Sequence, residues 1–93
     1  MKIFDWDAEK NEWLRRVRGV SFERIVFLIE NGALLDVVVH HNPSKYPNQK
    51  IFIVSLDRYA WLVPFVESAD RYFLKTIIPS RKATKQYLEV SDD

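Results

Sequence analysis

The first apolar positions of the chain follow a helical spacing. Asp7 is a typical helix N-cap, because its carboxylate can accept hydrogen bonds from the free N–H groups of a first turn. Trp13, Leu14 and Val17 then form a narrow apolar face, and Gly19 supplies the left-handed residue that often ends a helix. The pattern therefore predicts a first helix between Asp7 and Gly19.

A second helix is predicted directly after the first. Ser21 is its expected N-cap, and Asn31-Gly32 is its expected end. Between these residues the apolar side chains recur every three or four positions, at Phe22, Ile25, Val26 and Ile29.

After Gly32 the period changes to that of strands. Four runs rich in β-branched and aromatic residues follow, at Leu34–His40, Ile51–Leu56, Tyr59–Glu67 and Arg71–Ile78. The gaps before the third and fourth runs have hairpin length, which indicates antiparallel neighbours. Pro79 is expected to stop the last strand, and Ser80 to cap a short helix that ends near Leu88.

This order predicts an α+β fold in one domain, residues 1–93, with two helices packed on a four-stranded antiparallel sheet and a short C-terminal helix. Pro64 falls in the middle of the third strand, where its lack of an N–H should interrupt a ladder. We therefore expect that strand either to be bulged at Pro64 or to lie at a solvent-facing edge.

Composition narrows the class of protein. Hydrophobic residues make up 47% of the chain and charged residues 29%, as in globular domains. There is no cysteine, which excludes disulfides, zinc–thiolate sites and thiol catalysis. No apolar run approaches the roughly 18 residues of a membrane span, and the N-terminus lacks a signal-peptide pattern. We expect a cytoplasmic protein without a membrane partner.

The net charge of +1 hides an uneven distribution of the basic residues. The segment from residue 71 to residue 88 has no acidic residue and carries Arg71, Lys75, Arg81, Lys82 and Lys85. A second, weaker basic group is offset by nearby acids and comprises Lys10, Arg15, Arg16, Arg18 and Arg24. Either group is a solvated face or a surface for an anionic partner.

The acid-free segment is the better candidate for a site. Strict alternation along the last strand places Arg71 and Lys75 on one face together with Phe73 and Ile77. The next two cations, Arg81 and Lys82, lie at the start of the final helix, where the helix dipole disfavours them unless an anion is bound. A phosphate group would suit that position.

Metal and nucleotide chemistry receive little support from the sequence. Adjacent strand residues face opposite sides, so His40 and His41 cannot easily chelate one ion, and we expect no metal and no cofactor. No Gly-rich phosphate loop or nucleophile motif is present, which excludes Rossmann and P-loop functions. A histidine can still act as an acid or base, because its pKa lies near neutrality.

Two motifs at opposite ends of the chain resemble those of a known family. The runs Phe4–Asn11 and Arg18–Glu23 resemble the opening of BrnT-type toxins, in which Trp-Asp-x-x-Lys-x-x leads through a short helix into Gly-Val-Ser-Phe-Glu. The run Ile77–Thr84 resembles the family's Ile-Ile-Ser-Ala-Arg-Lys-Ala-Thr. The family belongs to the RelE/ParE superfamily of toxin–antitoxin systems. The resemblance implies a helix pair packed on a four-stranded sheet.

The chain also departs from the family pattern. The family usually has Lys-His before Gly-Val-Ser, where this chain has Val17-Arg18. An arginine commonly precedes Ile-Ile, whereas here that position is Thr76 and the basic Lys75 stands one place earlier. The segment from residue 45 to residue 50 is also atypical.

The resemblance implies a ribonuclease toxin that cleaves RNA without a metal, by attack of the 2′-hydroxyl, and that a small DNA-binding antitoxin neutralises in a hetero-complex. We expect Lys75 and Arg81 to stabilise charge and Tyr87 or His41 to transfer protons. The expected RNA-binding residues are Arg71, Lys82, Lys85 and Tyr46, with Tyr72 as a further stacking candidate. The alternative is a non-catalytic RNA- or protein-binding module on the same fold.

Overall fold

A computed structural model of the chain describes residues 2–39, 42, 44–45 and 48–89. The helices are α1 (Ala8–Arg18), α2 (Phe22–Glu30) and α3 (Arg81–Tyr87). The strands are β1 (Ile3–Trp6), β2 (Leu34–Val39), β3 (Gln49–Leu56), β4 (Tyr59–Glu67), β5 (Arg71–Leu74) and β6 (Ile78–Pro79).

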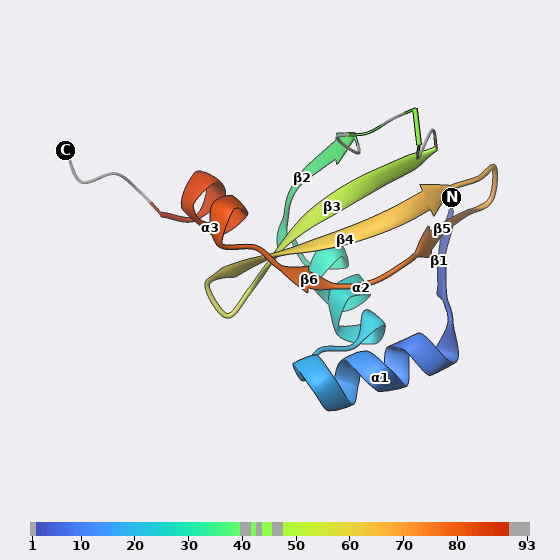
Figure 1. Ribbon diagram of the computed structural model, residues 1–93, viewed down its shortest axis with the longest axis horizontal. Helices are drawn as coiled ribbons and strands as arrows, with labels where there is room; N and C mark the ends of the chain where they lie inside the picture. Colours follow the sequence, from blue (N-terminus) through green and yellow to red (C-terminus); the bar gives the residue numbers. More distant parts are fainter. Residues whose placement is uncertain (1, 40–41, 43, 46–47, 90–93) are drawn as a thin grey trace.

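The strands form a single sheet in the order β1-β5-β4-β3-β2, and β6 pairs with β4 (Figure 1). All described pairs are antiparallel except β1 with β5. The predicted α+β class and mostly antiparallel sheet are confirmed, but the predicted number of four strands is wrong. The strand at Ile3–Trp6 was missed, and the run Arg71–Ile78 is divided between two strands.

The predicted helix signals are present in the structure. The Asp7 carboxylate accepts from the Lys10 N–H, and Gly19 ends α1 with a φ of 67°. The Ser21 hydroxyl likewise accepts from the N–H of Arg24 at the start of α2. The side chain of Ser80 caps α3, as the sequence predicts.

Apolar side chains gather on both faces of the sheet. One face carries the main core, which joins α1 and α2 to the sheet through Leu14, Val20, Phe22, Ile25, Phe52, Val54, Leu56, Val63, Phe65, Leu74 and Ile77. A smaller cluster joins α3 to the alternate strand positions and comprises Ile53, Ala60 and Ala83. Because strand side chains alternate between faces, α3 lies on the face opposite α1 and α2 (Figure 1).

Pro64 lies opposite the break between β5 and β6. The register of these strands against β4 slips by one residue between the pairs Leu74–Phe65 and Ile78–Leu62. Three residues, 75–77, therefore face two on β4. The carbonyl of Pro64 accepts from the Lys75 N–H at 2.8 Å, so its missing N–H points toward the same break.

Neither expectation for Pro64 describes this arrangement. β4 is a central strand with an unbroken register against β3, and the extra residue lies in the strands that face it. The slip also makes the predicted alternation of the last strand wrong. Leu74 and Ile77 are both fully buried in the main core, because the extra residue reverses the facing side after the break.

Candidate functional site

α3 is held against β4 by hydrogen bonds to the backbone of one residue, Ala60. The N–H of Ser80 donates to the carbonyl of Ala60 at 3.0 Å, and the N–H of Ala60 donates to the hydroxyl of Thr84 at 2.8 Å. The Thr84 hydroxyl in turn donates to the carbonyl of Ser80. Thr84 is buried, so these bonds are shielded from water. The helix that carries the predicted basic residues is therefore firmly attached at its N-terminal end.

The basic surface, defined here as Lys75, Arg81, Lys82 and Lys85, is exposed to solvent. None of its four cations makes an ion pair with the residues that the structure describes. By contrast, Lys2 and Lys50 both pair with Glu67. The basic surface thus carries positive charge that the acids within the described residues do not neutralise.

Arg71 does not belong to this basic surface. Its guanidinium pairs with Asp5 on β1 at 2.8 Å and with Asp70 at 3.3 Å. The pKa of Asp70 is lowered mainly by its hydrogen bond from Arg71. The sequence did not indicate β1, which supplies Asp5 through the parallel pairing of β1 with β5. The expectation that Arg71 binds an RNA backbone stays a prediction.

Lys75 and Arg81 are anchored apart along β4. The N–H of Lys75 bonds to Pro64, whereas Ser80, which precedes Arg81, bonds to Ala60. Four residues of a strand span about 13 Å. The backbone attachments of the two cations are therefore separated along β4. The Lys75 ammonium lies 5.6 Å from the ring centroid of Phe73.

Tyr87 is committed to a hydrogen bond with β2. Its hydroxyl donates to a carboxylate oxygen of Asp36 at 2.6 Å. This hydrogen bond raises the pKa of Tyr87 and lowers the pKa of Asp36. A phenol that is hydrogen-bonded to a carboxylate is harder to deprotonate, so this geometry favours a structural role for Tyr87 over that of a general base.

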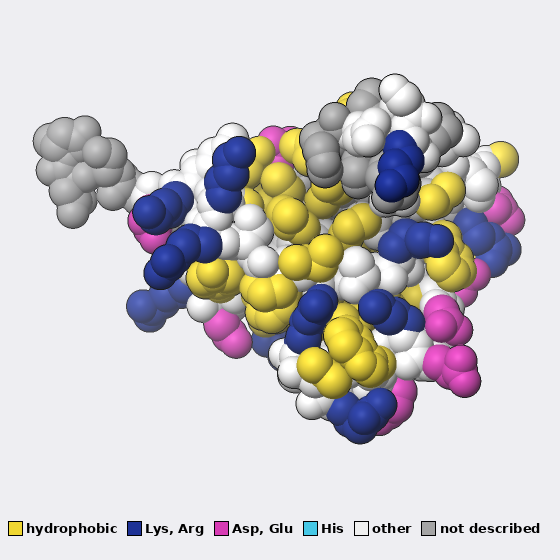
Figure 2. All heavy atoms as spheres, in the orientation of Figure 1, with side chains coloured by type: hydrophobic (Ala, Val, Ile, Leu, Met, Phe, Trp, Pro, Cys, Tyr) yellow, Lys and Arg dark blue, Asp and Glu magenta, His cyan; other side chains and the backbone are white. Residues whose placement is uncertain are grey.

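An apolar hollow of about 240 Å³ lies between α3 and the sheet. Its sheet side is aliphatic, and its α3 side carries longer polar groups; the lining residues are Val38, Ile51, Ile53, Leu62, Ser80, Lys82, Ala83, Gln86 and Tyr87. Figure 2 shows apolar side chains over the sheet in this region, with Lys and Arg side chains along the margin formed by α3.

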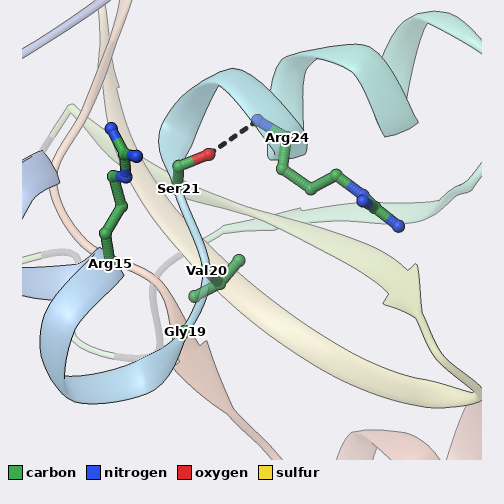
Figure 3. A pocket seen from close by; sticks show the side chains of 5 residues that line it. All are labelled: Arg15, Gly19, Val20, Ser21 and Arg24. Carbon is green, nitrogen blue, oxygen red and sulfur yellow. Dashed lines mark hydrogen bonds between the residues drawn. The ribbon is translucent and has the colours of Figure 1, made fainter.

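Two members of the second basic group, Arg15 and Arg24, do not converge on one site (Figure 3). Arg15, Arg24 and the segment between α1 and α2 line a shallow hollow of about 350 Å³. Figure 3 shows the two guanidinium groups on either side of this segment, directed away from one another. The guanidinium groups of Arg15 and Arg24 therefore cannot bind one anion together in this arrangement.

A contact between α1 and the segment after β5 was not predicted from the sequence. Nη1 of Arg18 donates to the carbonyl of Ile77 at 2.6 Å, across 59 positions of sequence. The side chain of Asn11 is buried, donates to Glu23 and accepts from the N–H of Phe22. The segments that carry the family resemblance thus meet in space, although no local signal in the sequence indicates these pairings.

The remaining predicted residues lie elsewhere or outside the described residues. His41 and Tyr46 are not among the described residues. Tyr72 packs against the core and makes ring contacts with Phe4, Phe52 and Phe65, so it is not a free stacking surface. Among the described residues, no three His, Asp or Glu side chains form a group that could hold a metal ion. In the same part of the chain, no helix has the length and apolarity to cross a membrane.

Comparison of the chain with protein-family models, curated proteins and solved structures finds no match.

Proposed function

We propose that the chain is a metal-independent endoribonuclease of the BrnT type that binds single-stranded RNA along the basic surface. The observation that carries the RNA-binding half is the charge of Lys75, Arg81, Lys82 and Lys85, which no described acid pairs with. Cations that no described acid pairs with attract a phosphate backbone, and three of these four lie on the anchored helix α3. We place this activity in the cytoplasm.

The cleavage half rests on the family resemblance. In such a reaction the 2′-oxygen bonds to phosphorus as the bond from phosphorus to the 5′-oxygen breaks. The products are a 2′,3′-cyclic phosphate and a 5′-hydroxyl end. A base takes the proton of the 2′-hydroxyl, and an acid gives one to the leaving oxygen. We assign charge stabilisation to Arg81 and Lys75 on neighbouring phosphates, and backbone binding to Lys82 and Lys85.

The group that transfers protons lies outside the basic surface. Tyr87 is held by Asp36, which leaves His41 as the remaining candidate of the two predicted from the sequence. The alternative function, a binding module without catalysis, is favoured by this same observation. It retains the RNA or protein contact and omits the cleavage step.

The expected partner is a small antitoxin with an acidic segment. The apolar hollow beside α3 supports this proposal, because an apolar side chain could enter it while acids pair with Lys82 and its neighbours. Aromatic residues of the sheet region, Trp61, Phe65 and Phe73, are further candidates for an apolar anchor in this interface. Phe65 is only 1% exposed and therefore cannot offer such a contact.

Purified protein and an end-labelled single-stranded RNA provide the test. We expect cleavage that continues in the presence of a chelator and leaves a cyclic phosphate end. Arg81→Ala and Lys75→Ala should each slow cleavage by about 10²–10³-fold, the usual cost of losing a charge-stabilising group. Arg15→Ala, an exposed cation outside the basic surface, is the control and should cleave at the wild-type rate.

The outcomes separate the two functions. RNA that is bound but left intact supports the binding module and contradicts the nuclease. RNA that is neither bound nor cut contradicts both RNA proposals. A growth arrest on expression of the wild-type chain, absent with Arg81→Ala, would support the toxin assignment independently.

A further inference from the structure

The three tryptophans of the chain lie in different surroundings. Trp6 stacks on Phe22, with 5.6 Å between ring centroids. Trp61 has its indole nitrogen buried. Trp13, on α1, is half-buried and has two cations over its ring: the Lys10 ammonium is 4.5 Å and the Arg18 guanidinium carbon 5.2 Å from the ring centroid. Trp13 thus combines an aromatic ring with local positive charge at the surface.

Arg18 connects this tryptophan to the start of the basic surface. Its bond to the carbonyl of Ile77 places the end of α1 against the segment that leads through β6 to α3. The two residues of β6, Ile78 and Pro79, are both exposed. Four residues from Ile77 to Arg81 span at most about 14 Å. This strip of chain, from the contact with Arg18 to Arg81, thus has a cation at each end and two exposed apolar residues between them.

We propose that Trp13, with Lys10 and Arg18, is a stacking site for one unpaired base of an RNA strand that continues along this strip to α3. The proposal rests on the proposed function and names its substrate as single-stranded RNA. A base would replace the Lys10 ammonium over the ring, and the displaced ammonium would then pair with the phosphate of the same nucleotide. Base stacking holds the strand in register while α3 contacts its phosphates.

A purely structural role for Trp13 makes a different prediction. The ring also packs against the main core, so its loss will affect stability whatever it binds. The test must therefore separate loss of folding from loss of a base contact. An RNA that lacks one base does this, since it leaves the protein unchanged.

The probe is a short single-stranded RNA with 2′-O-methyl groups, which cannot be cleaved, and a series with one abasic position each. For the wild-type chain we expect one abasic position to weaken binding by about 5- to 150-fold, the usual range for a stacked base. Trp13→Leu should weaken binding of the intact RNA similarly. The same abasic RNA should then bind Trp13→Leu no more weakly than the intact RNA does.

Two variants of aromatic residues complete the design. Trp13→Phe keeps a ring and should recover most of the affinity. Trp6→Leu removes a ring that packs on the core and stacks on Phe22 rather than lying under Lys10 and Arg18, and it should bind like the wild type. Thermal unfolding of each variant shows which fraction is folded at the assay temperature.

Lys10→Gln tests the charge beside the ring. It should reduce the slope of log affinity against log salt by about 0.7, as expected when one phosphate contact to a single strand is lost.

The results distinguish this proposal from the one on which it rests. The stacking site would be overturned if the abasic position and Trp13→Leu weakened binding additively. It would also be overturned if folded Trp13→Leu bound RNA as tightly as the wild type. Either result would leave RNA binding by the basic surface supported. A wild-type chain that does not bind the intact RNA would overturn both.

Discussion

The hydroxyl of Tyr87 on α3 donates a 2.6 Å hydrogen bond to the carboxylate of Asp36 on β2, across 51 positions of sequence. This bond joins the C-terminal end of α3 to an edge strand, while Ser80 and Thr84 join its N-terminal end to β4. α3 is thereby fixed at both ends over the sheet. A site built on its cations is held in place by neutral and acidic side chains rather than by the cations themselves.

Tyr87→Phe should therefore preserve the chemistry. We expect RNA cleavage within a few-fold of the wild-type rate, because the ring and its packing remain. Single-turnover cleavage of labelled RNA measures this directly. A loss of about 10²–10⁴-fold would instead identify Tyr87 as the general acid or base.

The same pair predicts how stability responds to pH. Asp36 has its pKa lowered from 3.8, so its contribution is present above that value and is lost as pH falls through the folded-state pKa. Tyr87 has its pKa raised from 10.0, so its contribution is present below that value and is lost as pH rises through the folded-state pKa. The difference in Tm between wild type and Tyr87→Phe should be largest between these limits and should shrink beyond both. Because both groups are only half-buried, the effect will be small, and a difference that is constant with pH would contradict it.

Asn11 is expected to be a structural residue of the resembling N-terminal motif. Asn11→Ala removes the buried acceptor for the N–H of Phe22 and should cost about 1–3 kcal/mol of unfolding free energy. For a domain of this size each kcal/mol lowers Tm by roughly 4–8 °C. Glu12→Ala, at the exposed neighbouring position, is the matched control and should change Tm little. Equal Tm values for the two variants would show that the Asn11 contact adds nothing.

Arg71 and Arg81 should differ in the salt dependence of RNA binding. Arg81→Ala removes an unpaired cation and should reduce the slope of log affinity against log salt by about 0.7. Arg71→Ala removes a cation that is already paired with Asp5 and Asp70, so its slope should stay close to that of the wild type. Titrations with uncleavable RNA at several salt concentrations test both. If the slope fell only with Arg71→Ala, the RNA would bind at Arg71 and not at the basic surface.

Local signals in the sequence predicted local structure well. The caps at Asp7, Ser21 and Ser80 each satisfy a free N–H within three positions, so composition and spacing suffice to find them. β1 was missed because Ile3–Trp6 is short and its partner β5 lies at the other end of the chain. No local pattern reports a parallel pairing over that distance.

The candidate site was predicted in part for the same reason. A stretch without acids is visible in the sequence, so Lys75, Arg81, Lys82 and Lys85 could be singled out. The neutralisation of Arg71 by Asp5 could not, since it depends on the unpredicted strand. The contact of Arg18 with Ile77 is a bond to a backbone carbonyl and leaves no trace in side-chain composition.

The one-residue slip opposite Pro64 determines which side chains of the following segment face the core. A continuous strand from Arg71 to Pro79 would have turned Ile77 outward and emptied its place in the core. The extra residue returns Ile77 to the core. It also shifts the inward–outward alternation of side chains by one residue in the segment that leads to α3. Deleting one residue between 75 and 77 would thus invert the C-terminal segment, whereas lengthening the hairpin that ends at Asp70 would leave its facing unchanged. One extra residue thus decides which side of the sheet the C-terminal part of the basic surface faces.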